Sequence, residues 1–130
     1  MSSIFTKIIN GEIPSYKIAE DENYCAFLDI NPNTKGHTLV IPKKEVDKFF
    51  DLDSETYVGL MQFAQRIAKA LKKTVSCNRI GMTVVGLEVP HAHVHLIPIN
   101  NVSDINFTSK KIKMEHEEFV ILAQEIATNF

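Results

Sequence analysis

The segment Pro90-His91-Ala92-His93-Val94-His95-Leu96-Ile97-Pro98 places a histidine at every second position, with small or branched apolar residues between them. Such alternation is typical of an extended strand, because successive side chains of a strand point to opposite faces. We therefore predict a strand that carries three imidazoles on one face and buries its apolar residues on the other. The imidazoles belong to His91, His93 and His95, and the apolar residues are Ala92, Val94 and Leu96.

A row of imidazoles on a strand has three uses that its spacing helps to separate. Two strand histidines at i and i+2, about 7 Å apart, can grip one metal ion. His91 and His95 would lie about 13 Å apart, too far to share one ion with bonds of about 2 Å. A neutral imidazole is a nucleophile near pH 7, and a protonated one stabilises anionic oxygens. The pattern favours phosphoryl chemistry and leaves a metal site or a solvated strand face as alternatives.

Length and charge narrow the class of protein. The chain has 130 residues, of which 45% are hydrophobic, and this is enough for one domain, residues 1–130, with its own core. A formal net charge of −2 argues against a protein that binds nucleic acid, which normally shows a basic face. The sequence shows no secretory signal and no apolar run of about 18 residues, so we expect a cytoplasmic protein that does not enter a membrane.

Periodicity and turn residues predict the other elements. A short helix, a β-hairpin, a strand, a long amphipathic helix and another strand precede the histidine segment, and a second amphipathic helix follows it. They cover residues 3–9, 16–20 with 24–30, 37–41, a helix that starts at Asp53-Ser54-Glu55, 79–85, and 119–127. This order indicates an α+β domain in which helices pack on one antiparallel sheet of about five strands.

Two blocks of the sequence resemble a known family. The run His91-Ala92-His93-Val94-His95-Leu96-Ile97 is similar to the signature of the histidine triad (HIT) superfamily, His-φ-His-φ-His-φ-φ with φ hydrophobic. Upstream, Ala26-Phe27-Leu28-Asp29-Ile30 followed by Gly36-His37-Thr38-Leu39-Val40-Ile41-Pro42-Lys43 resembles the second hallmark of that family. The resemblance runs from about residue 3 to about residue 98. It implies a HIT-like fold and a two-fold homodimer joined through sheets and long helices.

The resemblance also implies roles for four histidines. His93, the middle member, would attack phosphorus, while His91 and His95 would bind oxygens around it and hold the tautomer of the nucleophile. His37 would support the triad from behind by hydrogen bonding.

A nucleotide pocket is the second implication of the resemblance. The short N-terminal helix would form part of the wall for the base, and Asp29 would accept hydrogen bonds from the two ribose hydroxyls. Glycine at position 86 would allow backbone to approach a phosphate closely. The expected pocket residues are Ile4, Phe5, Ile8, Phe27, Asp29, Ile30, Gly86, Glu88 and Val89. By pattern alone, the apolar residues also fit a core and Asp29 also fits a turn.

The sequence departs from the family at a zinc site. Many bacterial members carry Cys-x-x-Cys where this chain has Ser3 and Thr6, and a histidine where it has Glu45. Together with a triad histidine those groups hold a structural zinc. Neutral hydroxyls are poor zinc ligands compared with thiolate and imidazole. We therefore expect no metal of that type and no cofactor, since imidazolium could supply the positive charge.

A second departure lies immediately before the triad. The common pattern is Gly-Gln-Ser/Thr-Val-x-His, whereas this chain has Gly86-Leu87-Glu88-Val89-Pro90-His91. The usual amide and hydroxyl that donate to phosphate oxygens are replaced by Leu87 and Glu88. An acidic side chain near a phosphate repels it unless it is protonated or turned away. Further along, the basic run Lys110-Lys111-Ile112-Lys113 is more typical of a solvated face than of a site.

These patterns predict an enzyme that binds nucleotides. We expect a hydrolase or nucleotidyl transferase that cleaves purine nucleoside phosphoramidates at the α-phosphorus through a nucleotidyl-histidine intermediate. A dinucleoside polyphosphate hydrolase with the same nucleophile is one alternative. A nucleotide-binding or interaction module with weak or no catalysis is another, and a metal-dependent hydrolase is a third. The expected partners are a purine mononucleotide or phosphoramidate and a second copy of the chain.

Overall fold

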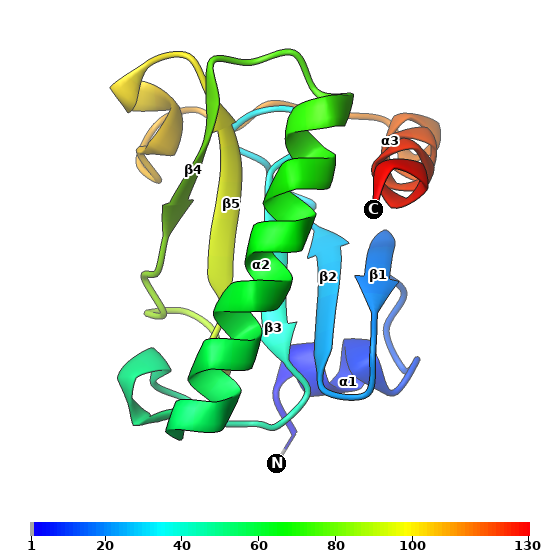
Figure 1. The fold of residues 1–130 in the computed structure, drawn as a ribbon. Helices are drawn as coiled ribbons and strands as arrows, with labels where there is room; N and C mark the ends of the chain where they lie inside the picture. The colour runs from blue at the N-terminus through cyan, green and yellow to red at the C-terminus, as the bar shows by residue number, and fades with distance from the viewer. Residues whose placement is uncertain (1) are drawn as a thin grey trace.

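The structure is a computed structural model that describes residues 2–130. One antiparallel sheet contains five strands in the order β1-β2-β3-β5-β4 (Figure 1). The strands are β1 (Lys17–Glu20), β2 (Tyr24–Leu28), β3 (Thr38–Pro42), β4 (Arg79–Thr83) and β5 (Val94–Ile99). The helices are α1 (Ile4–Ile9), α2 (Ser54–Thr74) and α3 (His116–Asn129), with 3-10 turns η1 (Phe49–Asp51) and η2 (Val102–Ile105). The α+β class and the order of elements are confirmed.

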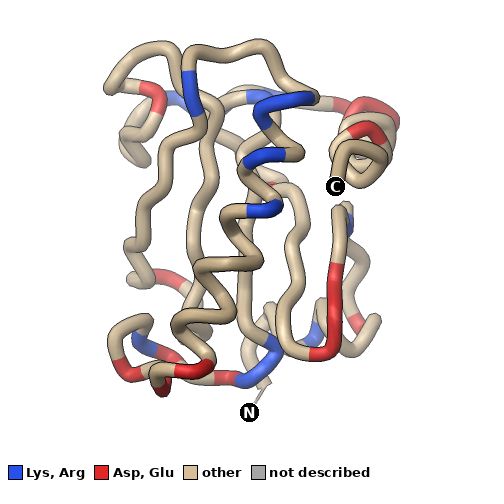
Figure 2. The backbone as a smooth tube through the Cα atoms, viewed as in Figure 1, with Lys and Arg blue, Asp and Glu red and all other residues tan. Residues whose placement is uncertain are grey.

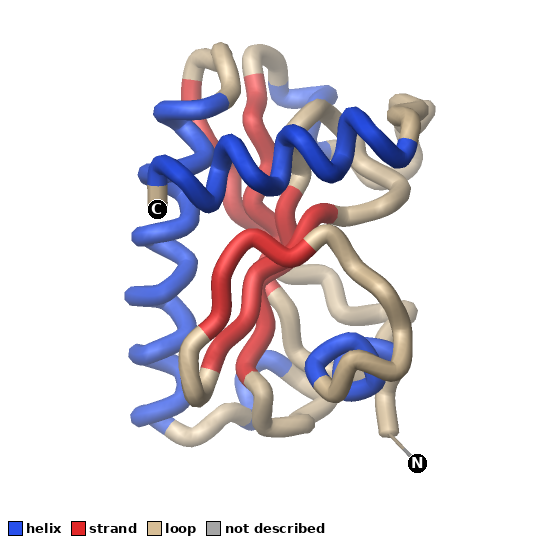
Figure 3. Tube along the Cα trace, turned by 90° about the vertical axis from the view of Figure 1, so that its right-hand side faces the viewer, coloured by secondary structure: helices blue, strands red, loops and turns tan. Residues whose placement is uncertain are grey.

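The sheet has a hydrophobic cluster on each face. The long helix α2 covers one face together with α3, and α1 lies on the other side (Figure 3). Because side chains alternate along a strand, β2 sends Ala26 and Leu28 into the α2 side and Cys25 and Phe27 into the α1 side. The strand β5 alternates in the same way, so His95 faces the α1 side. This side holds the candidate site.

The histidine segment forms a shorter strand than its pattern predicts. The strand β5 begins at Val94, so His95 lies in the strand while His91 and His93 precede it. The strands β2 and β4 also end two residues earlier than predicted. The predicted burial of the apolar residues between the histidines is nevertheless confirmed. Ala92, Val94 and Leu96 are each at most 2% exposed.

Pro42 explains why the strand is short. The pairing of β3 with β5 ends where Val40 lies opposite Val94. Two residues later, Pro42 has no backbone N–H to donate to a ladder. The chain before β5 finds another partner instead, because the N–H of Ala92 donates to the carbonyl oxygen of Val46 at 2.7 Å. The prediction of a strand is therefore wrong for residues 91–93.

The helix α2 approaches the sheet closely at Gly59. A β-carbon at this position would stand 1.9 Å from the hydroxyl oxygen of Tyr24 and 2.6 Å from its ring. The same hydroxyl donates to the carbonyl oxygen of Thr56 at 3.2 Å. The tyrosine ring therefore lies across the helix where glycine leaves room.

Charged residues are spread unevenly over the backbone. Lysine and arginine gather on the C-terminal half of α2, and acidic residues gather near η1 at the other end of the molecule (Figure 2). Basic residues at the C-terminal end of a helix interact favourably with its dipole. The basic half of α2 lies on the sheet face opposite α1, away from the candidate site. No helix within the described range 2–130 is long and apolar enough to cross a membrane.

Candidate active site

A cavity of about 530 Å³ is lined by α1, the end of β2 and the loops that follow β4 and η2. Its volume is typical of sites for small ligands. His93 and His95 line it, together with every residue that the sequence assigned to nucleotide binding. Those residues are Ile4, Phe5, Ile8, Phe27, Asp29, Ile30, Gly86, Glu88 and Val89. His91 and His37 do not line the cavity. The backbone oxygen of His91 contacts the ring of His93, and His37 contacts His95.

His93 presents a free nitrogen to the cavity. Its Nδ1 lies 2.8 Å from the backbone oxygen of His91, and a carbonyl oxygen only accepts, so Nδ1 carries the proton. In the neutral ring, Nε2 therefore keeps its lone pair. Burial is the main cause that lowers the pKa of His93 below its ordinary value, which favours this neutral form at pH 7. The ring of Phe5 packs edge-on at 5.0 Å between centroids and restricts the imidazole.

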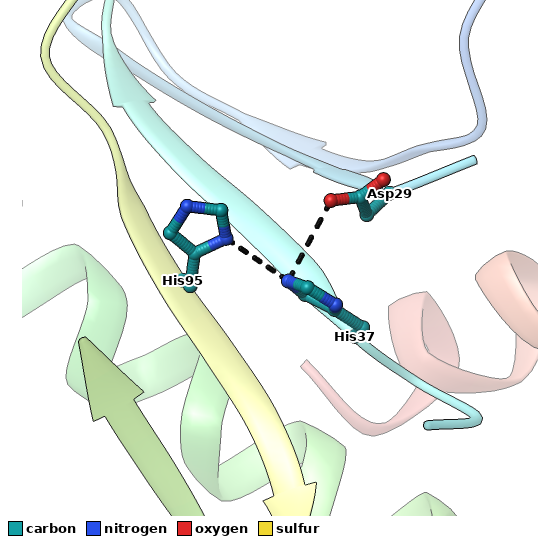
Figure 4. A group of neighbouring side chains, drawn as sticks. All are labelled: Asp29, His37 and His95. Atoms are coloured by element: carbon teal, nitrogen blue, oxygen red, sulfur yellow. Dashed lines mark hydrogen bonds and ion pairs between the residues drawn. The ribbon is translucent and has the colours of Figure 1, made fainter. Parts of the chain in front are cut away.

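His37 and His95 form a buried pair in which hydrogen bonds determine each tautomer. Nδ1 of His37 accepts the backbone N–H of Asn33 at 3.0 Å, so the neutral ring carries its proton on Nε2. That Nε2 lies 3.0 Å from Nδ1 of His95 and donates to it (Figure 4). His95 therefore carries its proton on Nε2, where it can donate to a ligand. Burial lowers the pKa of both rings to about 3, so both are neutral near pH 7.

The same pair, together with Asp29, is the candidate metal cluster within residues 2–130. One ligand atom from each residue lies within 4.8 Å of the others, and Oδ2 of Asp29 lies 3.6 Å from Nε2 of His37. A neutral histidine that binds metal through Nε2 must carry its proton on Nδ1. In this chain Nδ1 of His37 faces the N–H of Asn33 and must accept. The arrangement fits an ordered hydrogen-bond chain and does not fit a metal site.

His91 is held by a polar cluster at the start of α1. Its Nε2 donates to the carbonyl oxygen of Pro42 at 2.7 Å, and its Nδ1 lies 2.8 Å from the hydroxyl of Ser3, which donates to it. Oε1 of Glu45 accepts the N–H of Ser3 at 2.7 Å and the hydroxyl of Thr6 at 2.6 Å. These hydrogen bonds, led by the one from the Ser3 backbone, lower the pKa of Glu45 to about 2. These hydrogen bonds hold His91 in place. Its backbone oxygen in turn orients the imidazole of His93, which faces the cavity.

The apolar wall of the cavity comes from α1 and β2. Phe5 and Phe27 pack edge-to-face with centroids 5.5 Å apart. At the end of this wall, Asp29 lines the cavity, and its Oδ1 accepts the N–H of Asn31 at 2.8 Å. Burial is the main cause that raises the pKa of Asp29. A flat apolar group with a neighbouring diol would match this wall and carboxylate.

The loop after β4 places Gly86 and Glu88 at the cavity. Gly86 has a φ of 73°, in the region that favours glycine, and its missing β-carbon would meet no heavy atom within 4 Å. The carboxylate of Glu88 is exposed and lies close enough to raise the pKa values of both His93 and Asp29. Its charge therefore acts on the site.

The segment between η2 and α3 contributes residues that sequence reasoning missed. Phe107, Thr108 and Lys111 line the cavity, as does the turn at residues 13–15. The ring of Phe107 lies 4.7 Å from that of His95. The sequence signal here is the basic run, for which the sequence predicts a solvated face. For Lys111 that interpretation is wrong, because its side chain is half-buried at the cavity.

Comparison with known families agrees with this geometry. A family model described as the HIT domain matches residues 10–102, which is more than half of the chain and includes both sequence blocks. The chain belongs to the histidine triad superfamily. The expectation from the two sequence blocks is confirmed.

Curated HIT relatives cover much of the chain. An uncharacterized HIT-like protein from Borreliella burgdorferi is 39% identical over 97% of this chain and 96% of its own length. Adenosine 5'-monophosphoramidase HNT1 from Saccharomyces cerevisiae is 44% identical over 73% of this chain and 61% of its own length. Adenosine 5'-monophosphoramidase hnt1 from Schizosaccharomyces pombe is 33% identical over 98% of each chain. Named activities therefore occur among the HIT relatives of this chain.

Solved HIT structures share the fold. A Hit-like protein from Bartonella henselae has a TM-score of 0.85 and 34% identity, covering 99% of this chain and 97% of that chain. A zinc-bound histidine triad family protein from Mycobacterium smegmatis has a TM-score of 0.82 and 32% identity, covering 98% and 94%. The HIT-like fold of this chain, with its five-stranded antiparallel sheet, is confirmed.

The zinc-bound relative invites a test of the donor set at the start of α1. Thiolate, imidazole and carboxylate are good zinc ligands, and hydroxyls are poor ones. Here Ser3 and Thr6 provide hydroxyls that already take part in hydrogen bonds with His91 and Glu45. The residues present do not suit a zinc ion, and hydrogen bonds join them instead.

Proposed function

We propose that this HIT protein is a nucleotidyl hydrolase or transferase that cleaves purine nucleoside phosphoramidates, such as an adenosine 5′-phosphoramidate, at the α-phosphorus. One observation carries the proposal: Nδ1 of His93 is bonded to the His91 carbonyl, so a neutral Nε2 faces a nucleotide-sized cavity. The two relatives named adenosine 5'-monophosphoramidase support this substrate class. The proposal places the protein in the cytoplasm, with its nucleotide substrates.

The cavity walls suggest how the nucleotide lies. The purine packs on the apolar wall built by α1 and β2, where Phe5 and Phe27 meet. The ribose hydroxyls donate to Asp29, whose two oxygens can accept from a vicinal diol. This leaves the α-phosphate beside His93 and His95, whose ring centroids are 4.9 Å apart.

The reaction proceeds in two displacements. The lone pair on Nε2 of His93 attacks phosphorus, the phosphorus–nitrogen bond breaks, and the amine leaves with that electron pair. The departing nitrogen takes a proton from solvent and leaves as the free amine, while Nε2–H of His95 donates a hydrogen bond to the reacting group. Water then attacks phosphorus, the bond to His93 breaks with its electron pair returning to Nε2, and the proton lost by water passes to solvent. His91 acts through its backbone oxygen, which holds the tautomer of the nucleophile, and His37 holds that of His95.

A fluorogenic adenosine phosphoramidate tests the proposal. We expect a burst of released amine followed by steady turnover with the wild-type protein. The His93→Ala variant should lose turnover by a factor of about 10³ or more, as removal of a covalent nucleophile does, and should still bind AMP. The exposed His116→Ala variant is the matched control and should keep full turnover. Unchanged turnover by His93→Ala would refute the mechanism.

Glu88 supports a second candidate, a nucleotide-binding module with weak or no catalysis. Its carboxylate lies where relatives commonly place a hydroxyl that faces phosphate, and it lines the cavity. AMP binding measured by calorimetry without turnover of any phosphoramidate would favour this candidate. Faster cleavage of diadenosine polyphosphates than of phosphoramidates would instead assign a polyphosphate hydrolase with the same nucleophile.

The same proposal includes a homodimer. The strand β4 is an edge of the sheet, and beside it the outer side of α2 leaves a shallow apolar groove. Val58 is 51% exposed and Met82 is 43% exposed at this groove. A second copy that pairs β4 with β4 and α2 with α2 would cover both. Light scattering should give twice the monomer mass for the wild type and the monomer mass for Val58→Asp; a wild-type monomer would refute this.

A further inference from the structure

The cavity is short of positive charge for a ligand that carries a phosphate. Two carboxylates, those of Asp29 and Glu88, line it. Lys111 is the single lysine or arginine among the lining residues that the structure describes. His95 and its partner His37 are neutral near pH 7, because burial lowers their pKa values to about 3. A nucleophilic histidine must be neutral as well, so imidazolium does not supply the missing charge.

Lys111 is held in place rather than carried on a loose loop. The N–H of the next residue, Ile112, donates to the carbonyl oxygen of Pro32 at 3.1 Å. Nζ of Lys111 donates to Oδ1 of Asn33 and lies 4.7 Å from the centroid of the Phe107 ring. Side-chain nitrogen of that same asparagine donates to the backbone oxygen of Asp104 at 3.1 Å. The lysine thus has a defined position at the cavity.

This position brings the ammonium group beside the imidazoles. Asn33, which accepts from Lys111, also donates its backbone N–H to His37. Phe107, under the ammonium, stacks edge-on against His95 at 4.7 Å. The charge of Lys111 contributes to the lowered pKa values of His37 and His95 and opposes the rise that burial causes in the pKa of Asp29, which places it near all three. One of its three N–H donors serves Asn33, so two remain for phosphate oxygens.

We infer that Lys111 binds the phosphate of the nucleotide and supplies the permanent positive charge of this site. The inference rests on the proposed function for the identity of the ligand. Leu87 and Glu88 replace the amide and hydroxyl that usually donate to phosphate in this family. Lys111, in the segment between η2 and α3, supplies donors in their place. The substrate it selects is an anionic mononucleotide derivative rather than a neutral nucleoside.

The test compares AMP with adenosine, which differ by the phosphate alone. Calorimetry is run on the full-length wild type and on Lys111→Gln, Lys111→Arg and the control Lys113→Gln, whose side chain is exposed and outside the cavity lining. For Lys111→Gln we expect AMP affinity to fall about ten-fold or more, as the loss of a charge-assisted contact requires. Adenosine affinity should change less than about two-fold, and Lys111→Arg should restore most of the AMP affinity. Lys113→Gln should leave both affinities unchanged.

Salt provides an independent readout. Raising ionic strength from about 0.05 M to about 0.5 M should weaken AMP binding by the wild type more than by Lys111→Gln, because salt screens the ion pair with phosphate that only the wild type forms. Equal weakening of AMP and adenosine by Lys111→Gln would overturn the inference, and so would an unchanged AMP affinity. Lys111-dependent AMP binding by a wild type that cleaves no phosphoramidate would support this inference and refute the proposed reaction.

Discussion

Glu88 is a residue at which the candidate site departs from the common HIT pattern. It replaces a hydroxyl donor with a carboxylate, lines the cavity and is exposed to solvent. Two effects follow from its charge. The carboxylate would repel the phosphate of the proposed substrate, and it favours the protonated form of His93, whose pKa it raises against the larger lowering by burial.

Replacement of Glu88 by glutamine should therefore shift the pH profile in a defined direction. Without the carboxylate, the pKa of His93 falls further, so its neutral imidazole persists to lower pH. We expect the acid limb of the kcat/KM profile for a phosphoramidate to move to lower pH, and AMP affinity to rise by about two- to ten-fold. The exposed Glu22→Gln variant serves as control and should leave the profile unchanged. A shift of the acid limb to higher pH would contradict the assigned influence of Glu88.

Sequence reasoning located the cavity-lining residues that belong to local patterns and missed others that do not, among them Lys111. His93 and Asp29 belong to the two family blocks, and the structure places both at the cavity. Lys111 lies 78 residues from Asn33 along the chain, and their contact exists only because the segment before α3 returns over the loop before β3. Nor could spacing show that Ser3 would donate to His91, 88 residues away. Such contacts depend on tertiary packing, which composition and periodicity do not encode.

At the scale of elements, alternation was a good guide to burial and a poor guide to strand length. The residues between the histidines are buried as predicted, yet the strand starts only at Val94. A strand needs a partner with free N–H groups, and Pro42 on β3 removes one at the point where the ladder would continue. The residues before Val94 therefore leave the sheet, and the carbonyl oxygen of His91 lies 2.8 Å from Nδ1 of His93. The interruption therefore contributes to the position of the His93 ring, the proposed nucleophile.

The contact between α2 and β2 yields a prediction at this scale. Alanine has a higher helix propensity than glycine by about 1 kcal/mol, so Gly59→Ala would stabilise an isolated helix. In this protein the new β-carbon overlaps Tyr24, and we expect unfolding free energy to fall by about 1 to 3 kcal/mol. Urea denaturation of the variant measures the change.

A double variant separates the two effects. In a Tyr24→Ala background the overlap is removed, so Gly59→Ala should raise the unfolding free energy by up to about 1 kcal/mol. The same loss of stability in both backgrounds would show that the contact between Gly59 and Tyr24 is not the cause.

The whole molecule buries neutral imidazoles, and this couples its stability to pH. His37 and His95 have pKa values of about 3 in the folded state against an ordinary value of 6.5. Between these values the unfolded chain binds more protons than the folded chain, so stability is present above pH 6.5 and is lost as pH falls. Each ring contributes up to about 1.4 kcal/mol per pH unit in this window.

Denaturation at fixed protein concentration checks this coupling. We expect the unfolding free energy to decrease from pH 7 to pH 5, before the carboxyl groups begin to titrate. The His37→Asn variant should show a clearly weaker dependence than the wild type, since one of the buried neutral rings is removed. A wild-type stability that does not change over this range would contradict the assigned burial of neutral imidazoles.

The proposed reaction depends on one covalent bond, between Nε2 of His93 and the phosphorus of a nucleotide. Rapid mixing with an adenosine phosphoramidate, acid-free quenching and intact mass measurement test this bond directly. We predict a transient species heavier by one adenylyl group, formed at least as fast as amine is released, mapped by peptide sequencing to His93 and absent from His93→Ala. Turnover without any such species, or an adenylyl group on another residue, would contradict the account.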